Sequence, residues 1–386
     1  MPLAPSTVLI SAGEASGDRY AALLVEELRR RWPQTHFFGC TGPKMRAADV
    51  ETAVESESLA VVGLVEVLRH LPRIYGEFRK LLRAVDAQKP ALAILTDSPD
   101  FHLRVAKKLA NRKIPVAYLI APQVWAWRKG RLKSLRRLVR TLLCIFPFEE
   151  KFFCDNGVRA KFIGHPLAEL ARPVLTKQQF FAKHGIPEDC LLVALLPGSR
   201  QGEAIRHLAP LLKAVRQLGN EFRVRFVLPA SPNTGAAFFR ERIGCSAIQV
   251  IEGEAWDAMA HADLALAASG TVTTEAAILG TPMVIFYRVN RLSWLIGKML
   301  VNIPFFSMVN LIAGKRIVAE LIQGQMTGQA LVREAAVLLR SPAARLAMKS
   351  DLAVVAQKLH LNGTAGETAI SRAADEVVKV WEECVA

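Results

Sequence analysis

Residues 7–18 read TVLISAGEASGD, a short apolar run followed by a loop of small residues and the start of a helical pattern. Similar apolar runs at 92–95, 116–120 and 142–146 alternate with helical patterns through the first half of the chain. Short buried strands separated by helices are typical of a parallel sheet with crossover helices. We therefore predict a doubly wound α/β domain over residues 1–168.

A second series of apolar runs and helical patterns begins after Pro187. Because a chain of 386 residues exceeds what one hydrophobic core usually holds, we expect a second domain and place it at 169–354. The glycine and the two prolines of 164–177 fit a linker, and the helical tail of about 355–386 could pack back on the first domain. Two Rossmann-like α/β domains that face each other across a cleft match the GT-B architecture. Epimerases and phosphorylases share that architecture, so the site residues have to decide the function.

The chain is basic, with 50 Lys and Arg against 35 Asp and Glu and a net charge of +15. This balance favours an anionic partner, such as phospholipid, nucleotide or nucleic acid, without choosing among them. The six cysteines form no C-x-x-C pair and are expected to be reduced cytosolic thiols. The N-terminus lacks the basic start of a signal peptide, and charged residues, glycines or prolines interrupt the most apolar windows. We therefore expect a cytoplasmic protein whose membrane contact is peripheral.

The loop after the first apolar run supplies the first candidate binding residues, which are Ser11, Gly13, Glu14, Ser16 and Gly17. Glycines let the backbone approach a ligand closely, and a helix N-terminus favours anions. The Gly-x-x-x-Gly spacing departs from the Gly-x-Gly-x-x-Gly of dinucleotide sites. The alternative is a tight strand-to-helix turn in which Asp18 is a capping residue.

Two carboxylates, Asp97 and Asp100, follow the apolar run 92–95. Ligands of open parallel sheets bind beyond the carboxyl ends of the strands, where a carboxylate can act as a general base. Asp100 is our first choice for this base and Asp97 the second. The alternative makes Asp100 a helix cap and Asp97 a structural hydrogen-bond acceptor.

Gln123 and Trp125 begin a stretch in which two tryptophans precede a run of cations. The cations are Arg128, Lys129, Arg131, Lys133, Arg136, Arg137 and Arg140. Such a stretch could bind lipid headgroups or stack on sugars and bases, and the alternative is a solvated helix face. The segment 64–85 has the pattern of a basic amphipathic helix, which either contacts a membrane surface or faces the core.

Two loops of the second domain fit a nucleotide diphosphate, because each follows an apolar run and opens a helix. The first loop contains Gly198, Ser199 and Arg200, and the second contains Ser269, Gly270 and Thr271. Backbone amides at a helix start and the fork of an arginine side chain both suit phosphate. We expect the diphosphate on these loops and the ribose near Glu275, on the second helix.

Taken together, several stretches resemble the lipid-A-disaccharide synthase family, whose members join two acylated glucosamines in lipid A assembly. They are 11–18, 98–101, 122–128, 146–149, 162–166, 196–200, 268–271, and 310–314 with Glu320. One departure is the run SGTVTTE at 269–275, where an Ala-rich helix start is usual in the family.

The resemblance implies a GT-B enzyme that moves 2,3-diacylglucosamine from its UDP carrier to the 6-hydroxyl of 2,3-diacylglucosamine 1-phosphate. The new linkage would be β-1,6, formed with inversion and release of UDP. The resemblance puts the catalytic aspartate on Asp100 and the phosphate-binding arginine on Arg200, and it adds Asn310 and Glu320 to the donor site. It implies no metal and no other cofactor, in agreement with the missing Asp-x-Asp motif.

The partners implied are the UDP-activated glycolipid donor, the phosphorylated glycolipid acceptor and the anionic cytoplasmic face of a Gram-negative inner membrane. A homodimer is conceivable, and no nucleic acid is expected as a partner. One rival function is another GT-B enzyme, such as a UDP-sugar epimerase or a peptidoglycan glycosyltransferase. The other is a non-catalytic protein that binds membrane or nucleic acid through its basic surface. Release of UDP on addition of both glycolipids would separate an enzyme from a binder.

Overall fold

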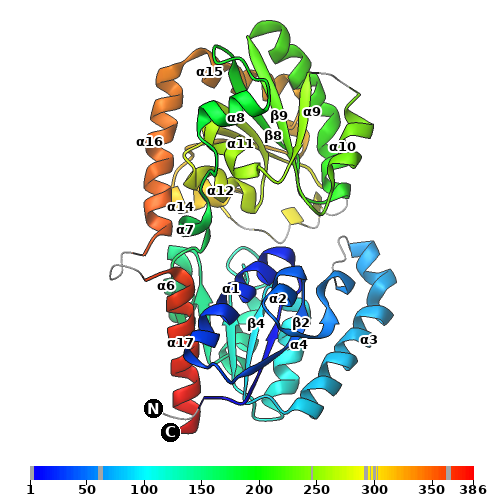
Figure 1. The fold of residues 1–386 in the computed structure, drawn as a ribbon, viewed down its shortest axis with the longest axis vertical. Coiled ribbons are helices and arrows are strands. Elements are labelled where there is room, and N and C mark those ends of the chain that lie inside the picture. Colours follow the sequence, from blue (N-terminus) through cyan, green and yellow to red (C-terminus); the bar gives the residue numbers. More distant parts are fainter. Residues whose placement is uncertain are drawn as a thin grey trace. The chain divides into compact units, whose positions relative to one another are not determined.

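The computed structural model describes residues 4–59, 64–244, 247–290, 294–295, 297–298, 301, 303–361 and 367–386, with backbone alone at 64–71. The chain divides into two compact units. Unit 1 comprises Met1–Pro166 with Leu361–Ala386, and unit 2 comprises Leu167–His360. Each unit is built on its own parallel sheet with helices packed on it (Figure 1).

Unit 1 contains a seven-stranded sheet in the order β3-β2-β1-β4-β5-β6-β7, and all of its pairings are parallel. Its strands are β1 (Thr7–Ser11), β2 (His36–Thr41), β3 (Glu51–Glu55), β4 (Leu92–Thr96), β5 (Val116–Leu119), β6 (Thr141–Cys144) and β7 (Ala160–Phe162). Its longer helices are α1 (Ala15–Arg31), α3 (Leu64–Gln88), α4 (Pro99–Ala110), α5 (Leu132–Leu138), α6 (Pro147–Asp155) and α17 (Ala369–Val385). Shorter helical turns are α2 (Pro43–Ala47), η1 (Ser56–Ser58) and η2 (Lys129–Arg131).

Unit 2 contains a six-stranded parallel sheet in the order β10-β9-β8-β11-β12-β13. Its strands are β8 (Leu191–Leu196), β9 (Val224–Ala230), β10 (Ile248–Glu252), β11 (Leu264–Ala268), β12 (Met283–Tyr287) and β13 (Ala319–Ile322). Its helices include α9 (Gln201–Glu221), α10 (Ala236–Ile243), α12 (Thr271–Ile278), α15 (Gly328–Arg340) and α16 (Pro342–Leu359). Shorter ones are α7 (Leu167–Leu170), α8 (Lys177–Lys183), α11 (Ala255–His261), α14 (Met308–Ala313) and η3 (Gln323–Gln325).

The strands form where apolar residues run without a break, because both faces of a parallel sheet are covered by helices. β4 and β11 are buried at every residue, and their side chains belong to the cores of unit 1 and unit 2 respectively. The predicted α/β class with two Rossmann-like domains is confirmed.

The order of strands contains one reversal in each unit. In unit 1 the chain winds from β1 outward to β3 and then returns to β4 on the other side of β1, and in unit 2 the same happens between β8 and β11. Loops at the carboxyl ends of the two central strands diverge at such a reversal, which makes it the usual ligand site of doubly wound sheets. The fold therefore directs attention to the ends of β1 and β4 and of β8 and β11.

The basic amphipathic segment becomes α3, and most of its described apolar side chains face the core, as the core alternative expects. Leu81 and Val85 are buried in the core of unit 1 and Ile74 and Phe78 pack against it, whereas Tyr75 is 61% exposed. The apolar spacing of a helix cannot by itself distinguish a core from a lipid surface. The part of the prediction that concerns the side chains of 64–71 lies outside the described residues. No helix in the described part of the chain is long and apolar enough to cross a membrane.

Candidate active site

Asp97 lies directly after β4 and is held by the loop that follows β1. Its Oδ1 accepts a hydrogen bond from the backbone N–H of Gly13 at 2.8 Å, and its Oδ2 accepts one from that of Glu14 at 3.1 Å. Burial raises the pKa of Asp97 to about 8, and the nearby charge of Glu14 adds to this effect. The structure thus brings Gly13, Glu14 and Asp97 together and gives Asp97 a pKa suited to proton exchange near neutrality.

The glycines of this loop are required by the closeness of Asp97. A Cβ on Gly17, in the first turn of α1, would lie 1.7 Å from Asp97 Oδ2, and a Cβ on Gly13 would lie 2.4 Å from Ser98 Oγ. Ser16 is half-buried in the same turn. The Gly-x-x-x-Gly spacing therefore admits a buried carboxylate as well as making a tight turn.

Asp18 is a capping residue, as the alternative for this loop suggested, but of a different helix. Its carboxylate accepts hydrogen bonds from the N–H groups of Gly42, Lys44 and Met45 at 2.9–3.0 Å. It therefore caps the N-terminus of α2 and not that of α1.

Asp100 occupies the first turn of α4 and differs from Asp97 in exposure, in hydrogen-bond partners and in the direction of its pKa shift. Its side chain is 69% exposed and forms ion pairs with Arg128 and Arg131, the former at 2.8 and 2.9 Å. Partial burial raises the pKa of Asp100, but hydrogen bonds and charge from the two arginines outweigh this and leave the pKa below its ordinary value. Asp100 is therefore accessible and ionised, whereas the Asp97 side chain is only 12% exposed and has a pKa of about 8.

Trp125 is held in place by a buried carboxylate that the sequence reasoning did not select as a site residue. Its indole Nε1–H donates to Glu149 Oε1 at 3.0 Å, and its ring meets Phe148 edge to face with centroids 5.0 Å apart. Burial raises the pKa of Glu149 to about 8. Gln123 is exposed at the start of the same stretch. The stretch 146–149 could have been recognised as a site segment, because it follows the end of a parallel strand.

In unit 2 the two predicted loops leave adjacent strands, since β8 and β11 are paired with Leu196 opposite Ala267. Ser199 and Arg200 are exposed at the start of α9, and Gly270 and Thr271 are exposed at the start of α12. Two helix N-termini thus lie beside the reversal of strand order, where backbone N–H groups favour anions. Glu275 lies one turn into α12 and Ser269 is half-buried before it.

Gly198 takes a left-handed backbone conformation, with φ at 119°. A Cβ at this position would meet Glu203 Oε2 at 2.6 Å, so the loop needs a glycine for both conformation and space. Glu203 receives a hydrogen bond from the Tyr287 hydroxyl and lies in the field of Arg200 and Arg206. Burial raises the pKa of Glu203, against the opposing effect of Arg200.

His207 links the loop after β8 to the residue that follows β12, and sequence reasoning missed it. Its Nδ1 lies 2.7 Å from the carbonyl oxygen of Pro197, and its Nε2 accepts a hydrogen bond from the backbone N–H of Arg288 at 2.9 Å. The imidazole is therefore neutral with its proton on Nδ1, and burial lowers its pKa. It fixes the end of β12 against the loop after β8.

Asn310 and Glu320 lie together in unit 2, inside a closed hydrogen-bond network. Glu320 accepts bonds from the N–H and hydroxyl of Ser307 at 2.9 and 2.7 Å and from the Asn310 amide at 2.8 Å. Asn310 is completely buried and also accepts bonds from the N–H groups of Ile317 and Val318. These bonds organise the segments around α14, and direct contact of either residue with a donor stays a prediction.

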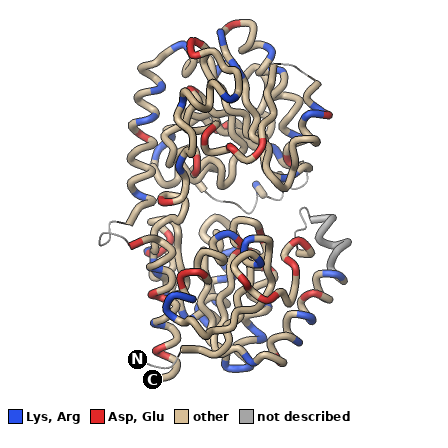
Figure 2. The backbone as a smooth tube through the Cα atoms, in the orientation of Figure 1, with Lys and Arg blue, Asp and Glu red and all other residues tan. Residues whose placement is uncertain are grey.

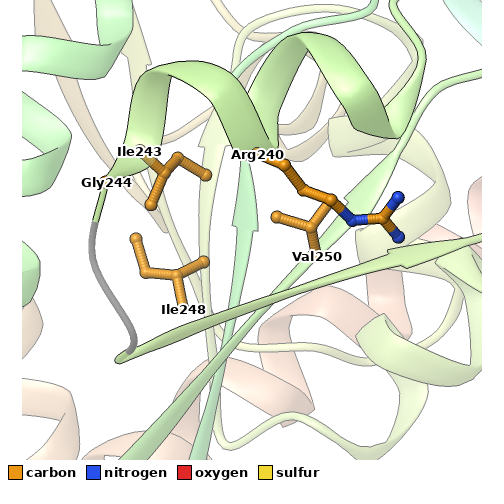
Figure 3. Close-up of a pocket in the computed structure, with 5 residues that line it drawn as sticks. All are labelled: Arg240, Ile243, Gly244, Ile248 and Val250. Atoms are coloured by element: carbon orange, nitrogen blue, oxygen red, sulfur yellow. The ribbon is translucent and has the colours of Figure 1, made fainter.

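Two surface pockets contain none of the phosphate-loop residues. One, of about 240 Å³, lies between α10 and β10 and is lined by Ile243, Ile248 and Val250 with Arg240 (Figure 3). The other, of about 470 Å³, includes Glu320, Arg316 and Arg333. Among the described residues, no group of three His, Cys, Asp or Glu side chains is placed to hold a metal ion.

The sequence is similar to a known protein family over almost its whole length. A family model described as lipid-A-disaccharide synthetase matches residues 8–369. A protein of Solibacter usitatus named lipid-A-disaccharide synthase is 61% identical over 376 residues, which cover 97% of each chain.

Solved structures show the same fold at low sequence identity. UDP-GlcNAc 2-epimerase from Neisseria meningitidis, bound to UDP-GlcNAc, has a TM-score of 0.63 at 14% identity, covering 98% of this chain and 100% of that chain. The glycotransferase of kitacinnamycin has a TM-score of 0.65 at 15% identity, with the same coverage of 98% and 100%. Glycosyltransferases and epimerases of the GT-B class are thus the structural neighbours, and at these identities the likeness concerns the fold alone.

Proposed function

The chain belongs to the lipid-A-disaccharide synthase family, glycosyltransferases of lipid A biosynthesis, and from this premise we propose its substrates and stereochemistry. The donor is UDP-2,3-diacylglucosamine and the acceptor is 2,3-diacylglucosamine 1-phosphate. The 6-hydroxyl of the acceptor displaces UDP with inversion, giving a β-1,6-linked disaccharide 1-phosphate.

The proposal rests on the loops after β8 and β11, which lie at the reversal of strand order and each open a helix, with Arg200 as the N-cap residue of α9. A departing UDP develops charge on its diphosphate, and backbone N–H groups with an arginine can stabilise that charge. We assign donor binding to unit 2 for this reason, with Gly198, Ser199 and Thr271 beside the diphosphate.

We assign acceptor binding and proton transfer to unit 1. Asp100 is the proposed base, because it is exposed, ionised and located at the carboxyl end of β4. Its two arginine partners also suit a phosphate, because a guanidinium group forms bidentate hydrogen bonds with phosphate oxygens. The acceptor's 1-phosphate could draw Arg128 and Arg131 away and leave the Asp100 carboxylate free to accept the proton of the 6-hydroxyl.

Asp97 is the alternative base. Its raised pKa suits general-base catalysis better than that of Asp100, but its oxygens already accept hydrogen bonds from Gly13 and Glu14. On this alternative the loop after β1 would have to release the carboxylate in the substrate complex. The two assignments make opposite predictions for the Asn variants, which are given in the Discussion.

We also propose that the protein works as a peripheral protein on an anionic, cytoplasmic membrane face, where both acylated substrates are held. The support is the set of exposed cations on η2 and α5, which includes Lys129, Lys133 and Arg137. Lys and Arg residues occur over both units, so the net charge of the chain does not by itself identify η2 and α5 as the membrane-binding surface (Figure 2). Reversal of Lys129, Lys133 and Arg137 to Glu should weaken adsorption to vesicles of anionic phospholipid, and salt should weaken adsorption of the unmodified protein.

A triple reversal at Lys213, Arg216 and Arg225 in unit 2 changes the net charge equally and serves as the control. Equal loss of adsorption for both triple variants would show that the whole charge matters and not this face. Retention by both would contradict an electrostatic membrane contact.

The function is tested by measuring UDP release from UDP-2,3-diacylglucosamine with and without the glycolipid phosphate. A glycosyltransferase needs both substrates for stoichiometric release, whereas a binding protein releases none. An epimerase would instead change the configuration of a UDP-sugar without an acceptor. UDP release that depends on the acceptor supports the proposal, and epimerisation in its place would overturn it.

A further inference from the structure

Three buried side chains from different elements meet at the turn that carries the two candidate bases. Ser11 is the last residue of β1, His102 lies on α4 and Tyr118 lies on β5. Ser11 Oγ is 2.8 Å from His102 Nε2, and His102 Nδ1 is 3.0 Å from the backbone carbonyl oxygen of Asp97. The Tyr118 hydroxyl donates to that same carbonyl oxygen at 2.5 Å. Ser11 and His102 are completely buried.

The partners determine the protonation of His102. A backbone carbonyl only accepts, so Nδ1 carries the hydrogen and donates to the Asp97 oxygen. Burial lowers the pKa of His102 to about 4, so the second nitrogen, Nε2, is unprotonated at neutral pH and accepts from the Ser11 hydroxyl. The groups that face the imidazole are the Ser11 hydroxyl, the Asp97 carbonyl, the Asp97 carboxylate and the ring of Phe101, at 5.3 Å between centroids. The Asp97 Oδ1 lies 3.9 Å from Nδ1, and the raised pKa of that carboxyl keeps it largely protonated at neutral pH.

The backbone that these bonds hold is unusual. Asp97 and Ser98 both have positive φ angles, 47° and 35°, which residues with a Cβ rarely adopt. Consecutive residues in this region persist only where surrounding contacts determine them. The N–H groups of Phe101 and His102 then bond to the Ser98 carbonyl at 3.0 Å and start α4. The direction of Asp100, in the first turn of α4, follows from this turn.

We propose that His102 is a positioning residue for the turn 96–100. Its neutral imidazole joins the Ser11 hydroxyl to the Asp97 carbonyl, and so fixes the direction in which the turn presents both carboxylates. Asp97 is then held at two ends, by Tyr118 and His102 at its carbonyl and by the loop after β1 at its carboxylate. The inference rests on the proposed function, because it takes this turn to carry the base. His102 itself does not touch the reacting atoms in this account.

The placement of the imidazole can be tested without any turnover. We expect nitrogen NMR of the ¹⁵N-histidine-labelled protein, with His102 assigned by loss of its signals in His102→Asn, to show Nδ1 protonated and Nε2 unprotonated from pH 5.5 to 8.5. A His102 that titrates in the ordinary histidine range near pH 6.5, or that carries its proton on Nε2, would overturn the inference.

The consequence for catalysis is tested with His102→Leu, which removes both hydrogen bonds. Small displacements of a catalytic group can cost about 100-fold in rate, so we expect kcat to fall about 10- to 100-fold while KM for both substrates changes less than about 3-fold. His102→Asn keeps an amide donor near the Nδ1 position and should recover most of this loss, whether or not the Leu variant folds well.

His261→Leu is the matched control, since it removes a histidine bond of 2.8 Å to the Leu175 carbonyl in unit 2. It should keep kcat. Normal kcat in a folded His102→Leu, no advantage of Asn over Leu, or an equal loss in His261→Leu would each overturn the positioning role. An inactive unmodified protein with the expected nitrogen spectrum would instead overturn the proposed function and leave the placement of His102 standing.

Discussion

The backbone N–H of Gly13 donates a hydrogen bond to Asp97 Oδ1 over 2.8 Å, although 84 residues separate the two in sequence. This bond joins the loops after β1 and β4, the two strands between which the winding of unit 1 reverses. Ligands of doubly wound sheets bind at such a reversal. The bond therefore connects the predicted binding loop to the predicted proton-transfer residues in one site.

Gly17→Ala should lower both stability and activity, because its Cβ would be 1.7 Å from Asp97 Oδ2 and would displace the carboxylate. Alanine in a helix is otherwise favoured over glycine by about 1 kcal/mol. Gly76→Ala in α3 is the control and should gain stability, because the new Cβ would have no described neighbour within 4 Å apart from the adjoining backbone of its own helix. Thermal unfolding and UDP release measure both effects. Normal activity of Gly17→Ala would show that the contact with Asp97 is not needed.

Arg200→Lys should reduce kcat/KM for the UDP-sugar by about 10- to 100-fold, because a lysine keeps the positive charge but cannot form the bidentate hydrogen bonds of a guanidinium group with a diphosphate. Arg216→Lys, on the exposed side of the same helix, should behave like the unmodified protein. Steady-state kinetics with the donor varied provide the comparison. If the two variants are equally active, Arg200 does not contact the diphosphate.

Glu149 should make stability depend on pH in a definite direction. Burial raises the pKa of Glu149 from 4.5 to about 8, so the folded state binds a proton that the unfolded chain has released. Its contribution to the unfolding free energy is then present in full below pH 4.5 and is lost as the pH rises through 8. The slope due to one such group is about 1.4 kcal/mol per pH unit at most.

Glu149→Gln should therefore flatten the decline of unfolding free energy between pH 5.5 and 8, as measured by urea denaturation. Glu383→Gln is the control, since the hydrogen bond from Arg159 lowers the pKa of Glu383 and moves its titration below this window. An unchanged slope in Glu149→Gln would mean that Glu149 is ionised throughout.

Asp100→Asn should lower kcat by about 100- to 10,000-fold, the usual contribution of a general base, while donor affinity survives. Asp97→Asn should be less damaging to chemistry, because an amide oxygen can still accept one of the two N–H bonds. The kcat–pH profile adds a second readout. The lowered pKa of Asp100 keeps that base ionised, so kcat should not fall between pH 8 and pH 6. If Asp97 is the base, its pKa of about 8 means that it becomes protonated over this range, and kcat should fall steeply. A dead Asp97→Asn with an active Asp100→Asn would transfer the role.

Periodicity and loop chemistry predicted the fold well, because buried parallel strands leave continuous apolar runs such as 92–95 and 191–196. The order of strands was not predicted, and it is this order that brings the loops after β1 and β4, and after β8 and β11, to neighbouring strand ends. Asp97 and Asp100 could be selected because they follow a strand.

The different environments of the two aspartates could not be predicted from sequence. They depend on Arg128 and Arg131, which approach from another segment, and on the amides of the loop after β1. His102 and His207 were missed because each lies on the buried face of a helix, where a histidine is usually read as part of the core. The face of α3 was ambiguous because an amphipathic pattern fits both a core and a lipid surface.

The proposed reaction is transfer of an acylated glucosamine from UDP to a glycolipid phosphate with inversion. The most direct measurement incubates the purified protein with UDP-2,3-diacylglucosamine and 2,3-diacylglucosamine 1-phosphate, and follows UDP, product mass and the anomeric proton coupling of the product. We expect a disaccharide 1-phosphate with a β-1,6 linkage and equal amounts of UDP and disaccharide. An α linkage, UDP without disaccharide, or no product from folded protein would contradict it.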